Sequence, residues 1–149
     1  MIYLLRHGDA EPDQGDGDAA RRLTARGEAQ ALAAGQAMAL LGLRVDCCLA
    51  SPRIRAWRTA ELACRPLGPE PELSAPIGSG DFDTLELTAG LGDVLLVGHE
   101  PVLSTETARL TGANIKLKKG GLAIIKGGQL LALLRPSEIE AVASAESRR

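Results

Sequence analysis

Ile2-Tyr3-Leu4-Leu5-Arg6-His7-Gly8 opens the chain, and Val94-Leu95-Leu96-Val97-Gly98-His99 has the same pattern later on. Each stretch is an apolar run that ends beside a histidine and a glycine. An uninterrupted apolar run of this length is typical of a strand buried on both faces, as in a parallel sheet. The two stretches therefore predict two central strands of an α/β fold, and we expect them to lie parallel and close together.

Helical and extended patterns alternate between these two strands. Thr24 is a suitable N-cap for a helix over residues 25–41, which Gly42 ends, and residues 45–50 form another strand-like apolar run. Ser51-Pro52 then fits an N-cap and first position of a helix to about residue 64. Residues 65–83 hold four of the eight prolines and predict an irregular connection.

The last third of the chain changes its period. A helix from Pro101 to about residue 110 is followed by alternation over residues 115–118. Apolar runs at 122–125 and 130–134 flank a Lys-Gly-Gly-Gln turn and predict a hairpin. Ser137-Glu138-Ile139-Glu140 fits a capping box for a terminal helix. The order predicts one three-layer α/β/α domain over residues 1–149, with a mostly parallel sheet and an antiparallel hairpin at its edge.

Composition excludes several classes of protein. The 149 residues suit one domain, and a net charge of −2 gives no basic excess for binding nucleic acid. The apolar runs are too short for a membrane span or a signal peptide. The three cysteines are odd in number and lack a C-x-x-C spacing, which disfavours a disulfide framework and a zinc site. We therefore expect a cytoplasmic protein without a metal.

The chain has two histidines, and both follow strands of the buried kind. Arg6 precedes His7, and Arg53 and Arg55 follow the apolar run at 45–50. Taken singly, each side chain could be structural or solvated. The carboxyl ends of parallel strands meet at one edge of a sheet, however, so these cations would repel one another unless they bound an anion. Arginine binds phosphate oxygens bidentately and a neutral imidazole can attack phosphorus, so the pattern predicts a phosphoryl pocket without a cofactor.

Four motifs in order resemble those of the histidine phosphatase superfamily. They are Leu5-Arg6-His7-Gly8-Asp9-Ala10, Leu23-Thr24-Ala25-Arg26-Gly27, Ser51-Pro52-Arg53-Ile54-Arg55-Ala56-Trp57-Arg58-Thr59-Ala60 and Val97-Gly98-His99-Glu100-Pro101. The resemblance implies a phosphoglycerate mutase-like fold, with His7 as the nucleophile that becomes phosphorylated. It also implies that Arg6 and Arg55 bind the phosphoryl oxygens and that His99 completes the pocket. Arg53 and Arg58 do not match the family's phosphate-binding position.

Within that superfamily the chain is similar to the small SixA-like phosphohistidine phosphatases. Pro71-Glu72-Leu73-Ser74 followed by Gly80-Asp81, and the acidic loop with Asp18, carry this likeness. The connection over residues 65–93 is too short for the helical lid of the larger members. The resemblance thus implies a compact enzyme with an open site.

The proton donor is the least determined part of the site. Asp18 and Asp81 are the named candidates, from a wider set that also includes Asp9, Glu72, Asp83 and Glu100. A phosphohistidine substrate has less need of a positioned acid than an alkyl phosphate ester, because solvent can protonate the leaving imidazole. We therefore expect a metal-independent phosphatase that acts on phosphohistidine of a partner protein.

Three alternatives remain open. The substrates could be small phosphorylated metabolites, which are phosphomonoesters. The domain could bind phosphate without catalysis, although the presence of both histidines argues against this reading. It could also be a mutase, which the missing lid and the lack of a second phosphate-binding cluster in the sequence disfavour.

Overall fold

The two histidine-bearing strands form the centre of the sheet. In a computed structural model that describes residues 1–145, β1 (Ile2–Arg6) pairs in parallel with β4 (Val94–Gly98). Leu4 lies opposite Leu96 in this register, and every residue of β4 is buried. The parallel, adjacent arrangement predicted from the two apolar runs is confirmed.

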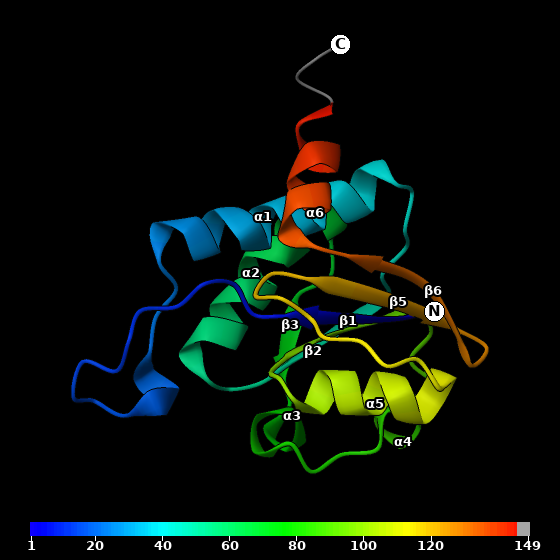
Figure 1. Cartoon of the computed structure of the whole chain (residues 1–149), viewed down its shortest axis with the longest axis horizontal. Coiled ribbons are helices and arrows are strands. Elements are labelled where there is room, and N and C mark those ends of the chain that lie inside the picture. The colour runs from blue at the N-terminus through cyan, green and yellow to red at the C-terminus, as the bar shows by residue number, and fades with distance from the viewer. Residues whose placement is uncertain (146–149) are drawn as a thin grey trace.

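The sheet has the order β3-β2-β4-β1-β5-β6 (Figure 1). Strands β2 (Cys47–Ala50) and β3 (Pro71–Leu73) extend the parallel part, whereas β5 (Leu122–Lys126) and β6 (Gln129–Leu134) add an antiparallel hairpin at the other edge. Gly127 and Gly128 in the hairpin turn have φ values of 55° and 76°. Positive φ at both central turn residues favours glycine, which explains the Gly-Gly pair. The predicted mixed sheet is confirmed.

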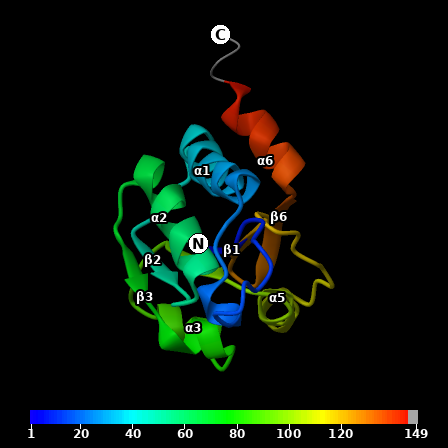
Figure 2. The same ribbon diagram turned by 90° about the vertical axis from the view of Figure 1, so that its left-hand side faces the viewer.

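Helices cover both faces of the sheet (Figure 2). One layer comprises α1 (Ala25–Leu40), α2 (Ile54–Leu67) and α6 (Pro136–Ala143), and the other comprises α3 (Ala75–Ser79), α4 (Thr84–Thr88) and α5 (Val102–Thr111). Successive side chains of β1 enter opposite cores: Tyr3 and Leu5 pack on the first layer, and Leu4 packs on the second. The three-layer α/β/α architecture is therefore as predicted.

Small residues allow the first layer to pack closely. A Cβ atom at Gly35 of α1 would lie 2.1 Å from the carbonyl oxygen of Ala63 in α2. The core around this contact is rich in alanine, with Ala34, Ala60 and Ala63 fully buried. Close backbone approach thus replaces the large aromatic side chains that the sequence lacks.

The start of α2 differs from the prediction. The hydroxyl oxygen of Ser51 accepts a hydrogen bond from the Arg53 amide (3.2 Å), and the helix begins only at Ile54. Ser51 is fully buried and also contacts His99, and Arg53 takes the N-cap position in its place. The helix also continues through Pro66 to Leu67, beyond the predicted end at residue 64.

The connection predicted as irregular over residues 65–83 contains an edge strand and a short helix. Pro71 begins β3, which is tolerated because an edge strand has a free side that needs no amide donor. Helix α3 follows, and its Ile77 enters the second core. The prediction missed both elements because proline-rich sequence resembles a loop.

One smaller prediction was also wrong, and the alternating residues 115–118 form no strand. The carbonyl of Leu117 accepts from Arg6 and its amide donates to Glu100. Helix α6 has Arg135 as its N-cap, and Glu138 accepts from the Arg135 amide (3.1 Å), so Ser137 lies inside the helix. Across residues 1–145, no helix combines the length and apolar character needed to cross a membrane.

Candidate active site

The ends of β1 and β4 bring the two histidines together. The ring centroids of His7 and His99 are 5.3 Å apart, with the planes tilted by 53°. The His7 amide donates to the carbonyl of Gly98 (3.1 Å), which continues the strand pairing up to the site. Both side chains are buried. The pair lies within the 10 Å or so that one phosphate could bridge, as the sequence predicted.

The hydrogen bonds of His7 define its tautomer. Its Nδ1 atom lies 2.7 Å from the carbonyl oxygen of Gly8, which can only accept, so Nδ1 carries the proton. The Nε2 atom therefore carries the lone pair and lies 3.4 Å from Nε of Arg55. Burial, partly opposed by the Gly8 hydrogen bond and helped by the charges of Arg55 and Arg6, lowers the pKa of His7 to about 4. At neutral pH the ring is uncharged and Nε2 is a free base.

Ser51 holds His99 in a complementary state. Its hydroxyl lies 2.7 Å from Nε2 of His99 and makes no other donating hydrogen bond within residues 1–145. Donation from this hydroxyl to Nε2 leaves the proton of His99 on Nδ1, which is buried and has no partner among the described residues. Burial and the neighbouring His7 lower the pKa of His99 to about 3. His99 is thus a neutral imidazole with an uncommitted donor beside His7.

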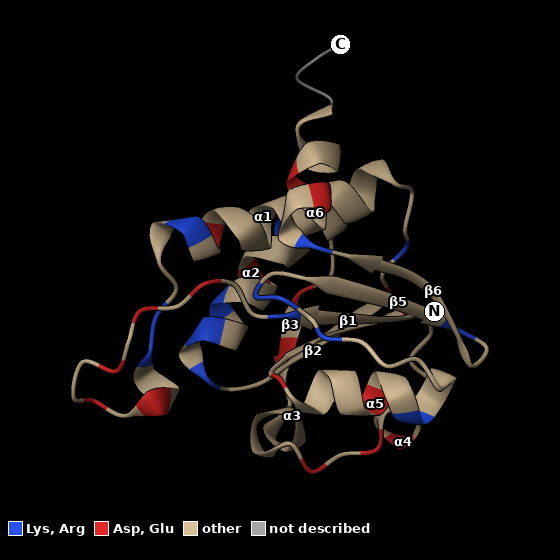
Figure 3. Ribbon diagram, viewed as in Figure 1, with Lys and Arg blue, Asp and Glu red and all other residues tan. Residues whose placement is uncertain are grey.

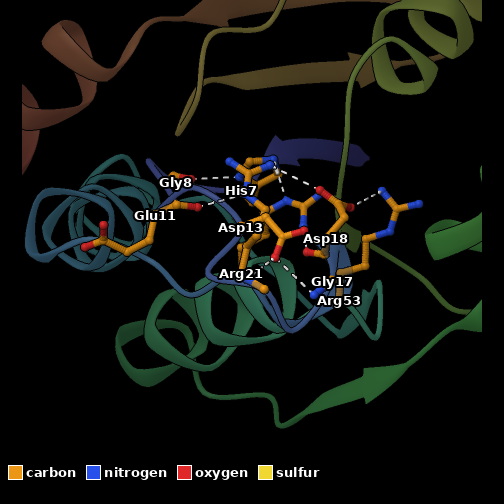
Figure 4. A network of polar contacts seen from close by, with 10 residues as sticks. His7, Gly8, Glu11, Asp13, Gly17, Asp18, Arg21 and Arg53 are labelled. Carbon is orange, nitrogen blue, oxygen red and sulfur yellow. Dashed lines mark hydrogen bonds and ion pairs between the residues drawn. The ribbon is translucent and has the colours of Figure 1, made fainter.

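Arg55 connects α2 to both His7 and the acidic loop. It is 4% exposed, and besides its contact with His7 it donates from Nη1 to the carbonyl of Asp18 (2.8 Å) and from Nη2 to the Asp18 carboxylate (3.1 Å). Figure 4 shows the Asp18 side chain beside His7, with Arg21 and Arg53 also directed toward it. The guanidinium that the sequence assigned to phosphate is held by a carboxylate in this conformation.

Arg6 immediately precedes His7 at the end of β1. Its Nη1 donates to the carbonyl of Leu117 (2.9 Å), while its buried Nε has no partner within the described part of the chain. Arg58 pairs with Glu28 (2.8 Å), away from the histidines, and Arg53 reaches the Asp18 carboxylate at 3.6 Å. The structure thus gathers Arg6, His7, Arg55 and His99 at one sheet edge.

The acidic candidates are placed very differently. Asp18 reaches the site, and its hydrogen bond to Arg55 lowers its pKa, so the carboxylate stays ionised at neutral pH. Asp81 follows α3, is exposed, and its amide donates to the Ser79 hydroxyl (3.4 Å).

The wider set of acidic candidates has structural partners. Asp83 caps α4, and Glu100 accepts from the amides of Ser104 and Leu117. Asp9 accepts from Thr24, and Glu72 lies on the edge strand β3.

Three supporting residues were missed as parts of the site, although they lie in the quoted motifs. Thr59 accepts from the Gly8 amide (3.1 Å) and donates to the Arg55 carbonyl (2.7 Å), so it joins the segment that follows His7 to α2. A Cβ atom at Gly8 would lie 2.5 Å from the carbonyl oxygen of Gly27. The third is Ser51. The spacing of the motifs was the available signal, because it brings these backbones into contact.

The described residues form no cluster of three or more His, Cys, Asp or Glu side chains suited to holding a metal ion. The positive groups of the site are instead Arg6 and Arg55. They can bind and neutralise a phosphoryl group, while Nε2 of His7 and Nδ1–H of His99 offer a nucleophile and a donor.

Comparisons with known proteins agree with this geometry. The model of the histidine phosphatase superfamily (branch 1) matches residues 2–86. An uncharacterized protein of Picosynechococcus sp. (strain ATCC 27264 / PCC 7002 / PR-6) is 38% identical over 142 residues, which covers 85% of each chain.

Solved structures share the fold. The protein histidine phosphatase SixA, in a complex with tungstate, has a TM-score of 0.81 at 21% identity and covers 93% of this chain and 98% of its own. The alpha-ribazole phosphatase of Shigella flexneri has a TM-score of 0.66 at 20% identity, with 90% and 95% covered. A mutant phosphoserine phosphatase of Entamoeba histolytica with bound phosphoserine has a TM-score of 0.67 at 18% identity, with 91% and 96% covered. At these identities the likeness shows the fold, which is the phosphoglycerate mutase-like one that the sequence predicted.

Proposed function

Because the chain belongs to the histidine phosphatase superfamily, we propose that it is a phosphatase that works through a phosphorylated His7, without metal or cofactor. The observation that carries this proposal is the state of His7. A hydrogen bond fixes its proton on Nδ1, burial keeps the ring neutral, and the lone pair of Nε2 lies beside Arg55. A neutral, oriented imidazole next to an arginine is what attack on a phosphoryl group requires.

The reaction has two displacements. First, Nε2 of His7 attacks phosphorus, and the bond to the leaving group breaks as that group takes up a proton. Arg6, Arg55 and the Nδ1–H of His99 stabilise the negative charge that spreads over the phosphoryl oxygens. Second, water attacks phospho-His7, its proton passes to a base, and inorganic phosphate leaves as Nε2 regains its lone pair.

Asp18 suits the second displacement better than the first. Its ionised carboxylate, held by Arg55, can accept a proton from the attacking water but has no proton to give at neutral pH. Asp81, the other candidate, has no contact with the histidines or Arg55 within residues 1–145. The proposed site therefore has several groups that bind an anion, but neither Asp18 nor Asp81 is suited to act as a general acid.

A weak general acid favours a substrate whose leaving group needs little help. The imidazole of phosphohistidine is protonated readily by solvent, whereas an alkoxide needs a positioned donor. We therefore propose phosphohistidine on a partner protein as the preferred substrate. Small phosphomonoesters are the second candidate, supported by the names of the alpha-ribazole and phosphoserine phosphatases that share the fold.

Two wider parts of the proposal concern the whole chain. One sheet contains all six strands of the described residues, which supports a single histidine phosphatase domain over residues 1–149.

The three cysteines, Cys47, Cys48 and Cys64, are all free thiols, which supports a reducing, cytoplasmic location.

A substrate panel tests the proposal. The purified chain is assayed in EDTA with a phosphohistidine peptide, a phospholysine peptide, a phosphoserine peptide and sugar phosphates. We expect turnover in EDTA, with the highest kcat/KM on phosphohistidine. A strict metal requirement, or no turnover of any member, would contradict the proposed phosphatase. A preference for sugar phosphates would leave the phosphatase in place and replace its substrate.

A further inference from the structure

A pocket next to Arg6 has neither Arg55 nor Asp18 in its lining. It has a volume of about 300 Å³, and its lining includes four cationic side chains with one carboxylate and one amide. These are Arg6, Arg26, Lys118, Lys119, Asp9 and Gln30. We call this cavity the basic pocket. Because Arg6 belongs to its wall and also lies beside His7, the basic pocket and the candidate active site share one guanidinium.

Two of the four cationic side chains in the basic pocket make no direct polar contact. The side chains of Arg26 and Lys118 are exposed and make no hydrogen bond or ion pair within residues 1–145. Lys119 reaches Asp9 only at 3.5 Å, and Asp9 also accepts a hydrogen bond from Thr24. The lining of the basic pocket thus holds four cationic side chains and one carboxylate, and like charges repel unless an anion lies among them. A chain with a net charge of −2 has no general excess of cations that would explain such a cluster.

The backbone fixes this charge relative to the nucleophile. The Gly120 amide donates to the carbonyls of both Arg6 (3.1 Å) and His7 (2.9 Å), and the Arg6 amide donates to Gly121 (3.0 Å). Lys118 and Lys119 immediately precede these contacts. Arg26 precedes Gly27, whose backbone packs against Gly8. The basic pocket is therefore attached to the end of β1, so its distance from His7 is fixed by the backbone.

The acidic loop that follows Gly8 contributes to both parts of the site: Asp9 lies in the wall of the basic pocket, and Asp18 is paired with Arg21, Arg53 and Arg55. The rest of the loop holds the exposed carboxylates of Glu11, Asp13 and Asp16, and the segment before β5 carries basic positions beside the end of β1 (Figure 3). An anionic part of a substrate bound at His7 would be repelled by these three carboxylates and attracted by the basic pocket. This asymmetry selects one direction for the part of the substrate that does not react.

We propose that the basic pocket is a second anion subsite, which binds a carboxylate or phosphate on the non-reacting part of the substrate. The inference rests on the proposed phosphatase and adds a substrate class to it: phosphorylated compounds with another anionic group close to the reacting phosphoryl group. That group would come either from an acidic side chain next to the phosphorylated residue of a protein or from a small phosphorylated acid.

Matched substrates test the subsite. One pair is a phosphohistidine peptide with Asp or with Asn beside the phosphorylated residue, and the other is phosphoglycerate with glycerol phosphate. For wild type we expect the anionic member of at least one pair to have a KM about tenfold lower, because charge-assisted hydrogen bonds to Lys or Arg are stronger than neutral ones. In a Lys118→Gln/Lys119→Gln double variant, and separately in Arg26→Gln, the ratio of the two KM values should fall toward one.

Lys126→Gln is the matched control, because Lys126 is an exposed cation at the far end of the sheet, beyond the pairing of Ile125 with Ile2. It should keep the wild-type ratio. Binding of the same compounds to His7→Ala, measured by calorimetry, reports the preference without turnover, so failure of the subsite is distinguishable from failure of the phosphatase. Discrimination within the peptide pair or within the small-molecule pair identifies the source of the anion. Equal binding within both pairs, or a ratio that the three substitutions leave unchanged, would overturn the subsite.

Discussion

The two pockets that meet at Arg6 hold their charged groups in opposite ways. In the pocket formed by His7, His99, Ser51 and Arg55, each side chain is buried and has at least one hydrogen bond. In the basic pocket, the side chains of Arg26 and Lys118 are exposed and make no hydrogen bond in the described chain. Pre-organised groups stabilise a transition state without rearranging, whereas exposed cations without fixed partners contribute mainly to binding. The contrast predicts that substitutions in the histidine pocket change kcat and that those in the basic pocket change KM.

The largest effect is expected from His7→Ala. Loss of the nucleophile removes the covalent route, so turnover of every substrate should fall by about 10⁴-fold or more. The side chain ends a strand and fills little of the core, so the thermal midpoint should stay near that of wild type. Steady-state assays and a thermal melt check this prediction. Near-normal turnover by folded His7→Ala would remove the distinction between the two pockets.

The next largest effects are expected from His99→Ala and Arg55→Ala. Each removes one contact to the phosphoryl oxygens, which costs on the order of 10²–10³ in kcat. Ser51→Ala, which only frees the tautomer of His99, should cost about tenfold and should shift the ¹⁵N resonances of the His99 ring. An unchanged His99 spectrum in Ser51→Ala would show that the hydroxyl does not position that ring.

Asp18→Asn is expected to have two smaller effects, one on phosphate binding and one on kcat. The Asp18 carboxylate holds Arg55 and so competes with a phosphate for the same guanidinium. Removing its charge should tighten inhibition by inorganic phosphate severalfold, while loss of the base lowers kcat about tenfold. Lys119→Gln, in the basic pocket, should leave kcat within about twofold. Weaker phosphate inhibition in Asp18→Asn would contradict the competition.

A different kind of effect is expected on stability as the pH changes. The pKa values of His7 and His99 are about 4 and about 3 in the folded chain, below the value of about 6.5 for an unperturbed histidine. Between these values the unfolded chain binds more protons, so the free energy of unfolding should decrease as the pH falls from about 6.5 toward 4. Denaturant titrations should show this slope weakened in His99→Gln and retained in Lys119→Gln, whose ammonium does not titrate in this range.

The sequence predicted the histidine pocket well because its residues follow strands. His7 and His99 come directly after apolar runs, and the ends of parallel strands share an edge, so their proximity followed from topology. The same logic predicted the central strands, the hairpin and α1 with its Thr24 cap. Each of these elements has a regular pattern of apolar residues or a cap within its own stretch of sequence, so it could be predicted without tertiary contacts.

The basic pocket escaped the sequence analysis because its parts are far apart along the chain. Arg26 lies in the first turn of α1 and Lys118 lies in an irregular segment, and only the packing of Gly27 and Gly120 against the end of β1 brings them together. Neither cation stands in a pattern that sets it apart from a solvated charge.

The role of Asp18 also depended on contacts that the sequence does not record. As a lone carboxylate in an acidic loop it resembled a proton donor, but Arg55 and Arg21 in the structure keep it ionised. Those tertiary partners therefore decide whether Asp18 can donate a proton or accept one. Edge strand β3 was missed for a related reason, since its pairing with β2 outweighs the prolines around it.

Direct trapping of the phosphorylated enzyme tests the central claim, which is covalent catalysis by His7. The chain is mixed with a labelled phosphohistidine peptide, quenched in alkali within one turnover and mapped by mass spectrometry. The account predicts one phosphate on Nε2 of His7, stable in alkali and lost in acid, and absent from His7→Ala. An acid-stable phosphate, or label on Ser51 or on an aspartate, would contradict it.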